Sequence, residues 1–177
     1  GTVRAEIAFV DKRADEMKII LSLGRQGVIP RRVTHNDTKF NNVLFDENDK
    51  GLCVIDLDTV MPGYVHYDFG DSIRTATNTA AEDEADVSKV AMNLALFEGY
   101  ARGFLSETRE VLTPAEIEHL AFAGRLLTFT IGLRFLTDYV DGDTYFKIAF
   151  PDHNIRRARA QFALLASMEA QADAMRR

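Results

Sequence analysis

The sequence predicts a mostly α-helical domain with one small β-hairpin. Apolar residues recur at spacings of three and four along most of the 177-residue chain, as in helices with one buried face. The stretch "TPAE", residues 113–116, has the spacing of a capping box with proline at the first helical position. Two short β-type runs, 43–45 and 52–55, flank the turn-rich connector "DENDKG".

The first half of the chain is expected to hold one helix and then the hairpin. Apolar residues in 3–21 are spaced four and three apart, and Gly24 and Gly27 can end that helix. A polar loop, residues 32–42, leads into the hairpin, and a second loop follows it. Another helix is expected to begin within residues 67–80.

Three strong helices are expected in the second half. The first has apolar residues on one face between Val87 and Phe104. The second begins at the Thr113 capping box and is expected to run to about Tyr139. Asp152 can cap the third. Phe129 and Phe135 belong to the expected core.

The composition excludes several classes of protein. The chain is 46% hydrophobic and 27% charged, which indicates one soluble domain with a real core. A net charge of -6 argues against a nucleic-acid surface, and the apolar runs are interrupted too early for a membrane span. The single cysteine, Cys53, rules out an intrachain disulfide and a cysteine-based zinc site. We expect it to be buried in its strand, and we expect a reducing, cytoplasmic setting.

The polar loop before the hairpin carries the chemistry. Asn42 follows Asp37 by five residues, and the second hairpin strand ends at Asp56, fourteen residues after Asn42. Adjacent antiparallel strands would place Asn42 and Asp56 side by side. Two oxygen donors suit Mg²⁺, which usually takes one or two protein ligands together with water and phosphates. The sequence therefore predicts a magnesium site that holds phosphates at this end of the hairpin.

Phosphoryl transfer from ATP is the reaction that this arrangement suits. It needs metal to neutralise charge, a carboxylate to orient and deprotonate the acceptor hydroxyl, and often a cation on the transferring group. Asp37 can be the carboxylate, and Lys39 can reach the phosphate. We expect His35 to brace the loop. The order of these residues is that of the kinase catalytic loop and its metal aspartate.

Two longer stretches carry a family resemblance. "THNDTKFNNVLFD" and "GLCVIDLDTVMPGYVHYDFGDSIR" resemble the phosphotransferase family that includes aminoglycoside phosphotransferases, choline kinases and homoserine kinases. The stretches "HNDTKFNNV" and "CVIDLDTVMPG" together are most similar to the corresponding sequences of the N-acetylhexosamine 1-kinases. The resemblance implies the C-terminal lobe of a protein-kinase-like fold and phosphorylation of an anomeric hydroxyl with ATP and Mg²⁺. It also implies sugar contacts from an arginine and a downstream tyrosine, which Arg134 and Tyr145 match by position.

Other assignments compete for some of these residues. Asp68-Phe69-Gly70 spells the metal motif of protein kinases, but it lies 26 residues after Asn42 with no strand leading into it. Asp68 is therefore predicted to cap a helix or brace the loop, and Asp58 is a weaker metal candidate than Asp56.

The two arginines of the apolar helix could also have a purely structural role. Arg125 and Arg134 can snorkel, or pair with a nearby carboxylate such as Asp138 or Asp141, instead of meeting a sugar.

The nucleotide-binding half of a kinase is missing from this sequence. No glycine-rich loop and no strand-borne lysine precede Asp37. We expect residues 1–177 to be a single domain, the C-terminal catalytic lobe of a truncated longer protein, without its N-terminal nucleotide-binding lobe. The isolated lobe is then expected to be inactive, and its exposed surface favours a homodimer.

Two alternative functions stay open. The acceptor could be choline, an amino alcohol or an aminoglycoside, and an acidic pocket near 138–143 would favour such a cation. A non-catalytic kinase-like binding module is the alternative of another class. In every case the expected partner is a small molecule, with no nucleic acid and no membrane.

Overall fold

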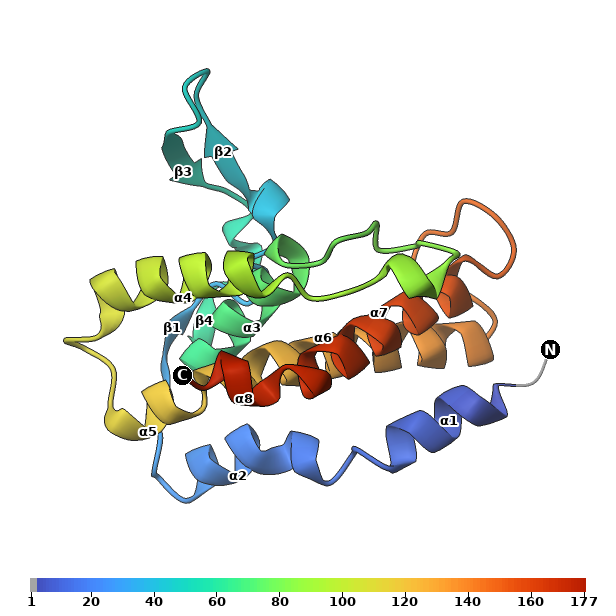
Figure 1. Cartoon of the computed structure of the whole chain (residues 1–177), viewed down its shortest axis with the longest axis horizontal. Helices are drawn as coiled ribbons and strands as arrows, with labels where there is room; N and C mark the ends of the chain where they lie inside the picture. Colours follow the sequence, from blue (N-terminus) through green and yellow to red (C-terminus); the bar gives the residue numbers. More distant parts are fainter. Residues whose placement is uncertain (1–2) are drawn as a thin grey trace.

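The computed structural model describes residues 3–177 (Figure 1), so the first two residues of the expected domain lie outside the described residues. The helices are α1 (Arg4–Asp11), α2 (Ile19–Arg25), α3 (Val65–Ala76), α4 (Leu94–Thr108), α5 (Pro114–Glu118), α6 (Leu120–Val140), α7 (His153–Ala170) and α8 (Ala172–Met175). Single 3₁₀ turns are η1 (Glu16–Lys18), η2 (Phe40–Asn42), η3 (Leu57–Thr59) and η4 (Val87–Lys89). The strands are β1 (Arg32–Thr34), β2 (Val43–Phe45), β3 (Gly51–Val54) and β4 (Met61–Gly63).

Helix α6 is the centre of the molecule. It packs against α3 and α7, while α1 and α2 run along one side of this group and α4 along the other (Figure 1). By length and composition α6 could cross a membrane, but 56% of its most apolar window is buried inside the protein. Its packing between α3 and α7 identifies it as a core helix of this fold.

The strands form two separate antiparallel pairs. The expected hairpin is present as β2–β3, with Val43 opposite Val54, and it projects away from the helices (Figure 1). A second pair, β1–β4, was not expected from the sequence; it places Thr34 opposite Met61. Because β1 leads into the 35–42 loop and β4 follows η3, this pair brings two distant loops together.

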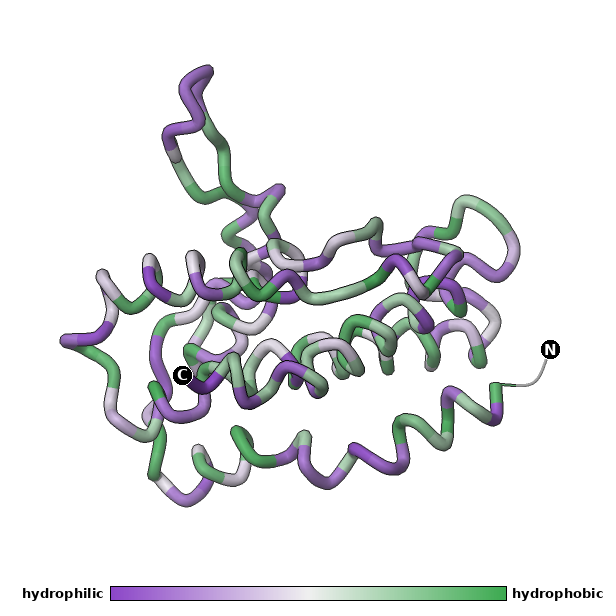
Figure 2. The backbone as a smooth tube through the Cα atoms, viewed as in Figure 1, coloured by the Kyte–Doolittle hydropathy of each residue, from purple (hydrophilic) through white to green (hydrophobic). Residues whose placement is uncertain are grey.

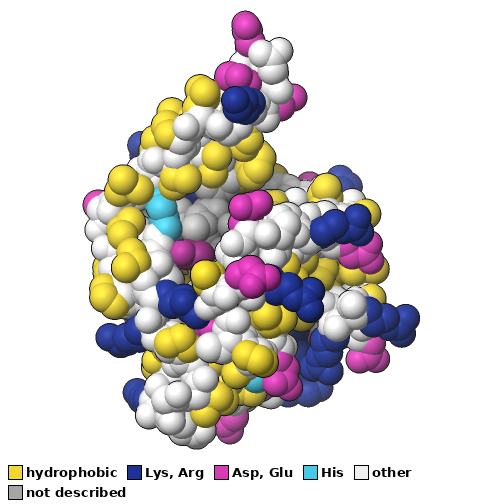
Figure 3. Space-filling view, turned by 90° about the vertical axis from the view of Figure 1, so that its left-hand side faces the viewer, with side chains coloured by type: hydrophobic (Ala, Val, Ile, Leu, Met, Phe, Trp, Pro, Cys, Tyr) yellow, Lys and Arg dark blue, Asp and Glu magenta, His cyan; other side chains and the backbone are white. Residues whose placement is uncertain are grey.

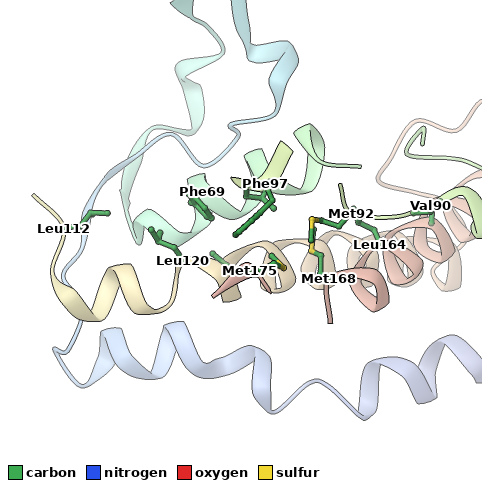
Figure 4. Packing of buried hydrophobic residues seen from close by; sticks show 12 residues of the cluster. Phe69, Val90, Met92, Phe97, Leu112, Leu120, Leu164, Met168 and Met175 are labelled. Atoms are coloured by element: carbon green, nitrogen blue, oxygen red, sulfur yellow. The ribbon is translucent and has the colours of Figure 1, made fainter. Parts of the chain in front are cut away.

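The apolar core gathers around α3 and α6. Phe69 is 1% exposed and lies in this core together with Phe97 (Figure 4). Its ring meets those of Phe97, Tyr100 and Phe104 edge-on. Helices α3 and α6 approach so closely at Gly70 that a Cβ there would lie 2.3 Å from the carbonyl oxygen of Ala123.

Both phenylalanines that were assigned to the core, Phe129 and Phe135, are buried. Cys53, which was also expected to be buried, is exposed. That prediction was wrong because neither face of the hairpin packs on the helices.

The predicted N-terminal helix is broken in two. The Arg13 side chain binds Glu169 at 2.7 Å and donates to the carbonyl of Phe9 at 3.1 Å. That carbonyl is the one that the Arg13 backbone N–H would use in a continuous helix, so the N–H turns to Val10 instead. Gly27, at φ +73°, follows the end of α2, whereas Gly24 lies inside it.

The later helices differ from expectation mainly at their ends. The Thr113 capping box is present in full, but the chain bends at His119 and divides the expected helix into α5 and α6. Helix α4 begins at an Asn93 cap, later than expected. Asp152 stands at the start of α7, yet its carboxylate accepts from the Tyr139 hydroxyl and caps no backbone N–H.

Candidate functional site

The 35–42 loop is held by the first turn of α3. The two carboxylate oxygens of Asp68 accept the backbone N–H groups of His35 and Asn36, at 2.8 and 2.7 Å. The Thr38 hydroxyl donates to the Asp68 carbonyl at 2.6 Å, and the Ser72 hydroxyl donates to the Thr38 carbonyl at 3.0 Å. Asp68 is therefore a brace for the loop and does not cap α3, whose N-terminal cap position is Tyr64.

Asp37 has one carboxylate oxygen engaged and one free. Lys39 Nζ and Asn42 Nδ2 both donate to Oδ2, at 2.7 and 2.9 Å, and Asn42 also donates to the Asp37 carbonyl at 2.8 Å. Oδ1 has no hydrogen-bond partner within residues 3–177. The bond to Asp37 raises the pKa of Lys39; burial opposes this, and the charges of Asp37, Asp56 and Asp71 add to it. Lys39 thus stays cationic beside the free oxygen.

Asp56 directly follows Ile55, the residue that bonds to Asn42 across the hairpin. The Ile55 N–H donates to the Asn42 carbonyl at 2.9 Å, which sets the Asp56 backbone just beyond the end of the ladder; the Asn42 side chain is buried. Asp56 is in the left-handed region, at φ 63°, a conformation that aspartate and asparagine adopt more readily than other non-glycine residues.

Asn42 and Asp56 both have side-chain oxygens that accept no hydrogen bond from the described residues. The Asp56 carboxylate and the Asn42 Oδ1 have no hydrogen-bond partner in the described part of the chain. Within that part, no group of three or more His, Cys, Asp or Glu side chains is arranged to hold a metal. An amide oxygen and a carboxylate are therefore the available donors here, and this pair fits Mg²⁺, which needs few protein ligands.

His35 belongs to the scaffold of the loop. Its Nε2 lies 2.9 Å from the carbonyl of Ile55, and its Nδ1 accepts the Asp37 N–H at 3.3 Å. Its own carbonyl accepts the Thr59 hydroxyl at 2.6 Å. Nε2 thus holds the loop against the segment around Asp56, whereas Nδ1 fixes the backbone of Asp37 within the loop.

Arg134 and Tyr145 meet each other. The guanidinium lies 3.4 Å from the Tyr145 hydroxyl, 5.5 Å from the centre of that ring and 5.1 Å from the centre of the Phe146 ring. The α6–α7 loop that carries Tyr145 lies toward the right-hand end of Figure 1, away from the 35–42 loop. Within the described residues no hydrogen bond or ion pair joins Arg134 or Tyr145 to the 35–42 loop.

The carboxylates near the α6–α7 loop stabilise the fold. Asp138 accepts the backbone N–H groups of residues 144–146 and, with Asp143, the side-chain amide of Asn154. Burial raises the pKa of Asp138, but these donors together hold it below its ordinary value.

The carboxylate partners expected for the two arginines were wrong. Arg125 pairs with Glu16 at 2.8 Å, and neither arginine pairs with Asp138 or Asp141 in the part of the chain that the structure describes.

The hairpin presents an apolar surface next to the site. We call it the hairpin face; its exposed apolar residues are Phe40, Leu44, Phe45, Leu52, Val54, Ile55 and Leu57. Figure 2 shows hydrophobic strands below a hydrophilic tip, and Figure 3 shows apolar side chains gathered below the charged tip. The rings of Phe40 and Phe45 stack at 5.3 Å. This surface lies directly above the loop that carries Asp37.

Sequence reasoning missed the residues that tie the loop to its surroundings. Asn36, Thr38, Thr59 and Ser72 all bond across segments more than 20 residues apart. Short polar residues in loops are common, so no local pattern marked them. The β1–β4 pair, once recognised, would have pointed to Thr59 and Asn36.

A sequence model of the APH phosphotransferase enzyme family matches residues 5–107, more than half of the chain. The chain belongs to this family. The matched region contains the 35–42 loop, the hairpin, Asp56 and Asp68. Membership in the APH family indicates a phosphotransferase of the kinase type. The mostly helical fold with a small antiparallel hairpin agrees with the expected C-terminal lobe of a kinase-like APH protein.

The match stops at the level of the family. It does not support the specific relation to N-acetylhexosamine 1-kinases that the two sequence stretches suggested. Arg134 and Tyr145 also lie beyond the matched residues.

Proposed function

We propose that this APH-family chain is the catalytic C-terminal lobe of an ATP-dependent kinase that phosphorylates a sugar, such as an N-acetylhexosamine, at its anomeric hydroxyl. The observation that carries the proposal is the state of the Asp37 carboxylate: Lys39 and Asn42 hold Oδ2, and Oδ1 bonds no group among residues 3–177. A general base needs this combination of a fixed orientation and an open oxygen.

Each loop residue then has one task. Asp37 Oδ1 accepts the proton of the acceptor hydroxyl while Oδ2 keeps the carboxylate in place. Lys39, kept cationic by its raised pKa, offsets negative charge on the phosphoryl oxygens. Asn42 steadies Asp37 through its Nδ2 and leaves its Oδ1 available.

Asn42 and Asp56 would hold Mg²⁺. When bound, the metal supplies positive charge that neutralises the ATP phosphates. The support for this assignment is the oxygen-only donor pair, whose oxygens bond no other group in the described residues.

The sugar assignment rests on the sequence resemblance, which implies sugar contacts from an arginine and a tyrosine at the positions of Arg134 and Tyr145. A guanidinium fork and a phenol can bind sugar hydroxyl or amide oxygens. Asp138 and Asp143, which a cationic acceptor would use, are engaged in internal hydrogen bonds. A neutral acceptor is therefore favoured over choline, an amino alcohol or an aminoglycoside.

The hairpin face favours a second, nucleotide-binding lobe above this one. Seven exposed apolar side chains on the projecting hairpin and at its base are costly to leave in water. We therefore propose that residues 1–177 form one catalytic domain and that the adenine is held mainly outside it. The chain by itself should release little or no ADP.

ADP release tests the proposal. The 177-residue chain and a version extended by its upstream coding sequence are assayed with ATP, Mg²⁺ and a panel of N-acetylhexosamines, choline and an aminoglycoside. We expect turnover only in the extended protein and only with a sugar. Asp37→Asn should lower kcat by about 10²–10⁴-fold, as loss of a general base does.

Each part of the proposal has its own contrary result. Equal turnover in Asp37→Asn would overturn the base assignment, and turnover by the 177-residue chain would overturn the two-lobe arrangement. Preference for choline would replace the sugar. Nucleotide binding without turnover on any acceptor would favour a non-catalytic binding module.

A further inference from the structure

Asn36 ties two segments together from inside the 35–42 loop. Its Nδ2 donates to the carbonyl of Thr59 at 2.9 Å and to that of Thr34 at 3.3 Å, and its Oδ1 accepts the Thr34 hydroxyl at 3.0 Å. The Thr59 hydroxyl donates in the opposite direction, to the carbonyl of His35 at 2.6 Å. Residues 35 and 36 are thus doubly bonded to Thr59.

The side chain of Asn36 has little room to move. Thr34, to which it bonds, is 2% exposed. Opposite them, a Cβ at Gly63 would lie 2.3 Å from Thr34 Oγ1 and 3.0 Å from Asn36 Oδ1. The Asn36 backbone N–H is held by Asp68. The side-chain amide therefore lies against Thr34 of β1 and Gly63 of β4, while α3 holds the backbone of the same residue.

The bonds of Asn36 join the two segments that carry Asp37 and Asp56. Asn36 directly precedes Asp37, and Thr59 follows Asp56 by three residues. On the hairpin side, the same two segments are joined by the bond from the Ile55 N–H to the Asn42 carbonyl. The segments of Asp37 and Asp56 are thus fastened on both sides.

We infer that Asn36 is a positioning residue that sets the separation between Asp37 and Asp56, an inference that rests on the proposed function for its catalytic meaning. Its backbone is left-handed, at φ 64°, which asparagine, aspartate and glycine tolerate best. Of these three, only asparagine offers a donor for Thr59 together with a neutral acceptor for Thr34.

The test uses Asn36→Gly, which keeps the left-handed backbone and removes the side chain. Asp49→Gly is the matched control: Asp49 is also left-handed, at φ 60°, and lies in the turn of the hairpin, where its carboxylate bonds no described residue. Two properties are measured in the 177-residue chain. They are hydrogen exchange of the backbone amides of residues 57–61, and Mn²⁺-induced broadening of the NMR signals of Asp37 and Asp56.

Asn36→Gly should speed exchange in residues 57–61 by about fivefold, as expected for the loss of one net hydrogen bond. It should also weaken Mn²⁺ binding several-fold. The difference in line broadening between the signal of Asp56, a proposed metal ligand, and the signal of Asp37, the proposed base, should become smaller. Asp49→Gly should leave both properties unchanged. In the extended protein, Asn36→Gly should lower kcat while the KM for ATP stays the same.

The outcomes separate this inference from the proposed function. Exchange in residues 57–61 that matches the control would overturn the positioning role, whatever the metal does. Faster exchange with unchanged Mn²⁺ broadening and unchanged kcat would overturn it as well. Failure of the unmodified chain to bind Mn²⁺ would instead refute the metal assignment of the proposed function, and the exchange measurement would still decide whether Asn36 holds the two segments together.

Discussion

The 35–42 loop and the hairpin that follows it are opposite kinds of structure, although they are continuous in the chain. The loop is polar and its groups are bonded to α3, η3 and the hairpin end, with Asp68 alone accepting two backbone N–H groups. The hairpin is apolar and exposed; its fixed contacts are its own ladder and the stack of Phe40 on Phe45.

The difference separates what this domain supplies by itself from what must come from elsewhere. Preorganised polar groups need rigid support, and α3 on the core helix α6 supplies it. Exposed apolar groups need a partner surface. Under the proposed function, the domain orients the catalytic groups without help, and its hairpin face is the surface that a second lobe would cover.

The largest effect should come from Asp68→Ala, which removes the brace of the loop. Two charge-assisted hydrogen bonds to backbone amides are lost, at a cost of about 3 kcal/mol in the free energy of unfolding. Urea unfolding followed by circular dichroism measures it. A loss below about 0.5 kcal/mol would mean that the loop is no more firmly held than the hairpin.

Gly70→Ala should be the next largest, because it pushes α3 away from α6. The new methyl group would lie 2.3 Å from the Ala123 carbonyl oxygen, and overpacking of this kind costs about 2 kcal/mol. Gly103→Ala, in α4 where nothing lies within 4 Å, is the control and should stabilise by about 0.5–1 kcal/mol. If both variants were stabilised, the close support of the loop by α6 would be disproved.

Glu116→Gln tests whether the bracing extends to the start of β1. The Glu116 carboxylate is buried and binds Arg32 at 2.7 and 2.8 Å, just before the loop. Burial raises the pKa of Glu116, but Arg32 and Thr113 outweigh it and leave the pKa below the ordinary 4.5. We expect a loss of about 1 kcal/mol at pH 7.

The pH dependence of that loss has a definite sign. A depressed carboxyl pKa stabilises the fold above the unfolded value of 4.5, and this contribution disappears as the pH falls through the folded value. The difference between the parent protein and Glu116→Gln should therefore shrink below about pH 4.5 and stay constant above it. Unfolding curves between pH 3 and 7 measure this, and a difference that grows in acid would contradict it.

The smallest effect should come from Leu52→Thr on the hairpin face. Leu52 is 62% exposed, so the free energy of unfolding should change by less than about 0.5 kcal/mol. Sedimentation should show weaker self-association if the hairpin face pairs two copies. A loss of more than about 2 kcal/mol would show that the hairpin is packed within the domain after all.

The pattern along the chain was enough to predict the helical lobe, the hairpin and the capping box at Thr113, because each depends on neighbours a few residues apart. The same holds for Asp37, Asn42 and Asp56: a loop, a strand, a turn and a strand of known lengths bring them to one place. The helix ends at Arg13 and His119 were missed, because competing side-chain contacts and packing decide them.

The sequence by itself determined which groups lie at the end of the hairpin, since strand pairing follows from local spacing. The tertiary structure alone decided how they are held. Asp68 on α3, Thr59 after the hairpin and the unexpected β1–β4 pair meet the loop from distant parts of the chain. Cys53 illustrates the same limit of local sequence. Its apolar strand predicts burial, yet Cys53 is exposed because the hairpin does not pack on the helices. Burial and long-range hydrogen bonds depend on what lies across from a residue in space, and local sequence does not encode that.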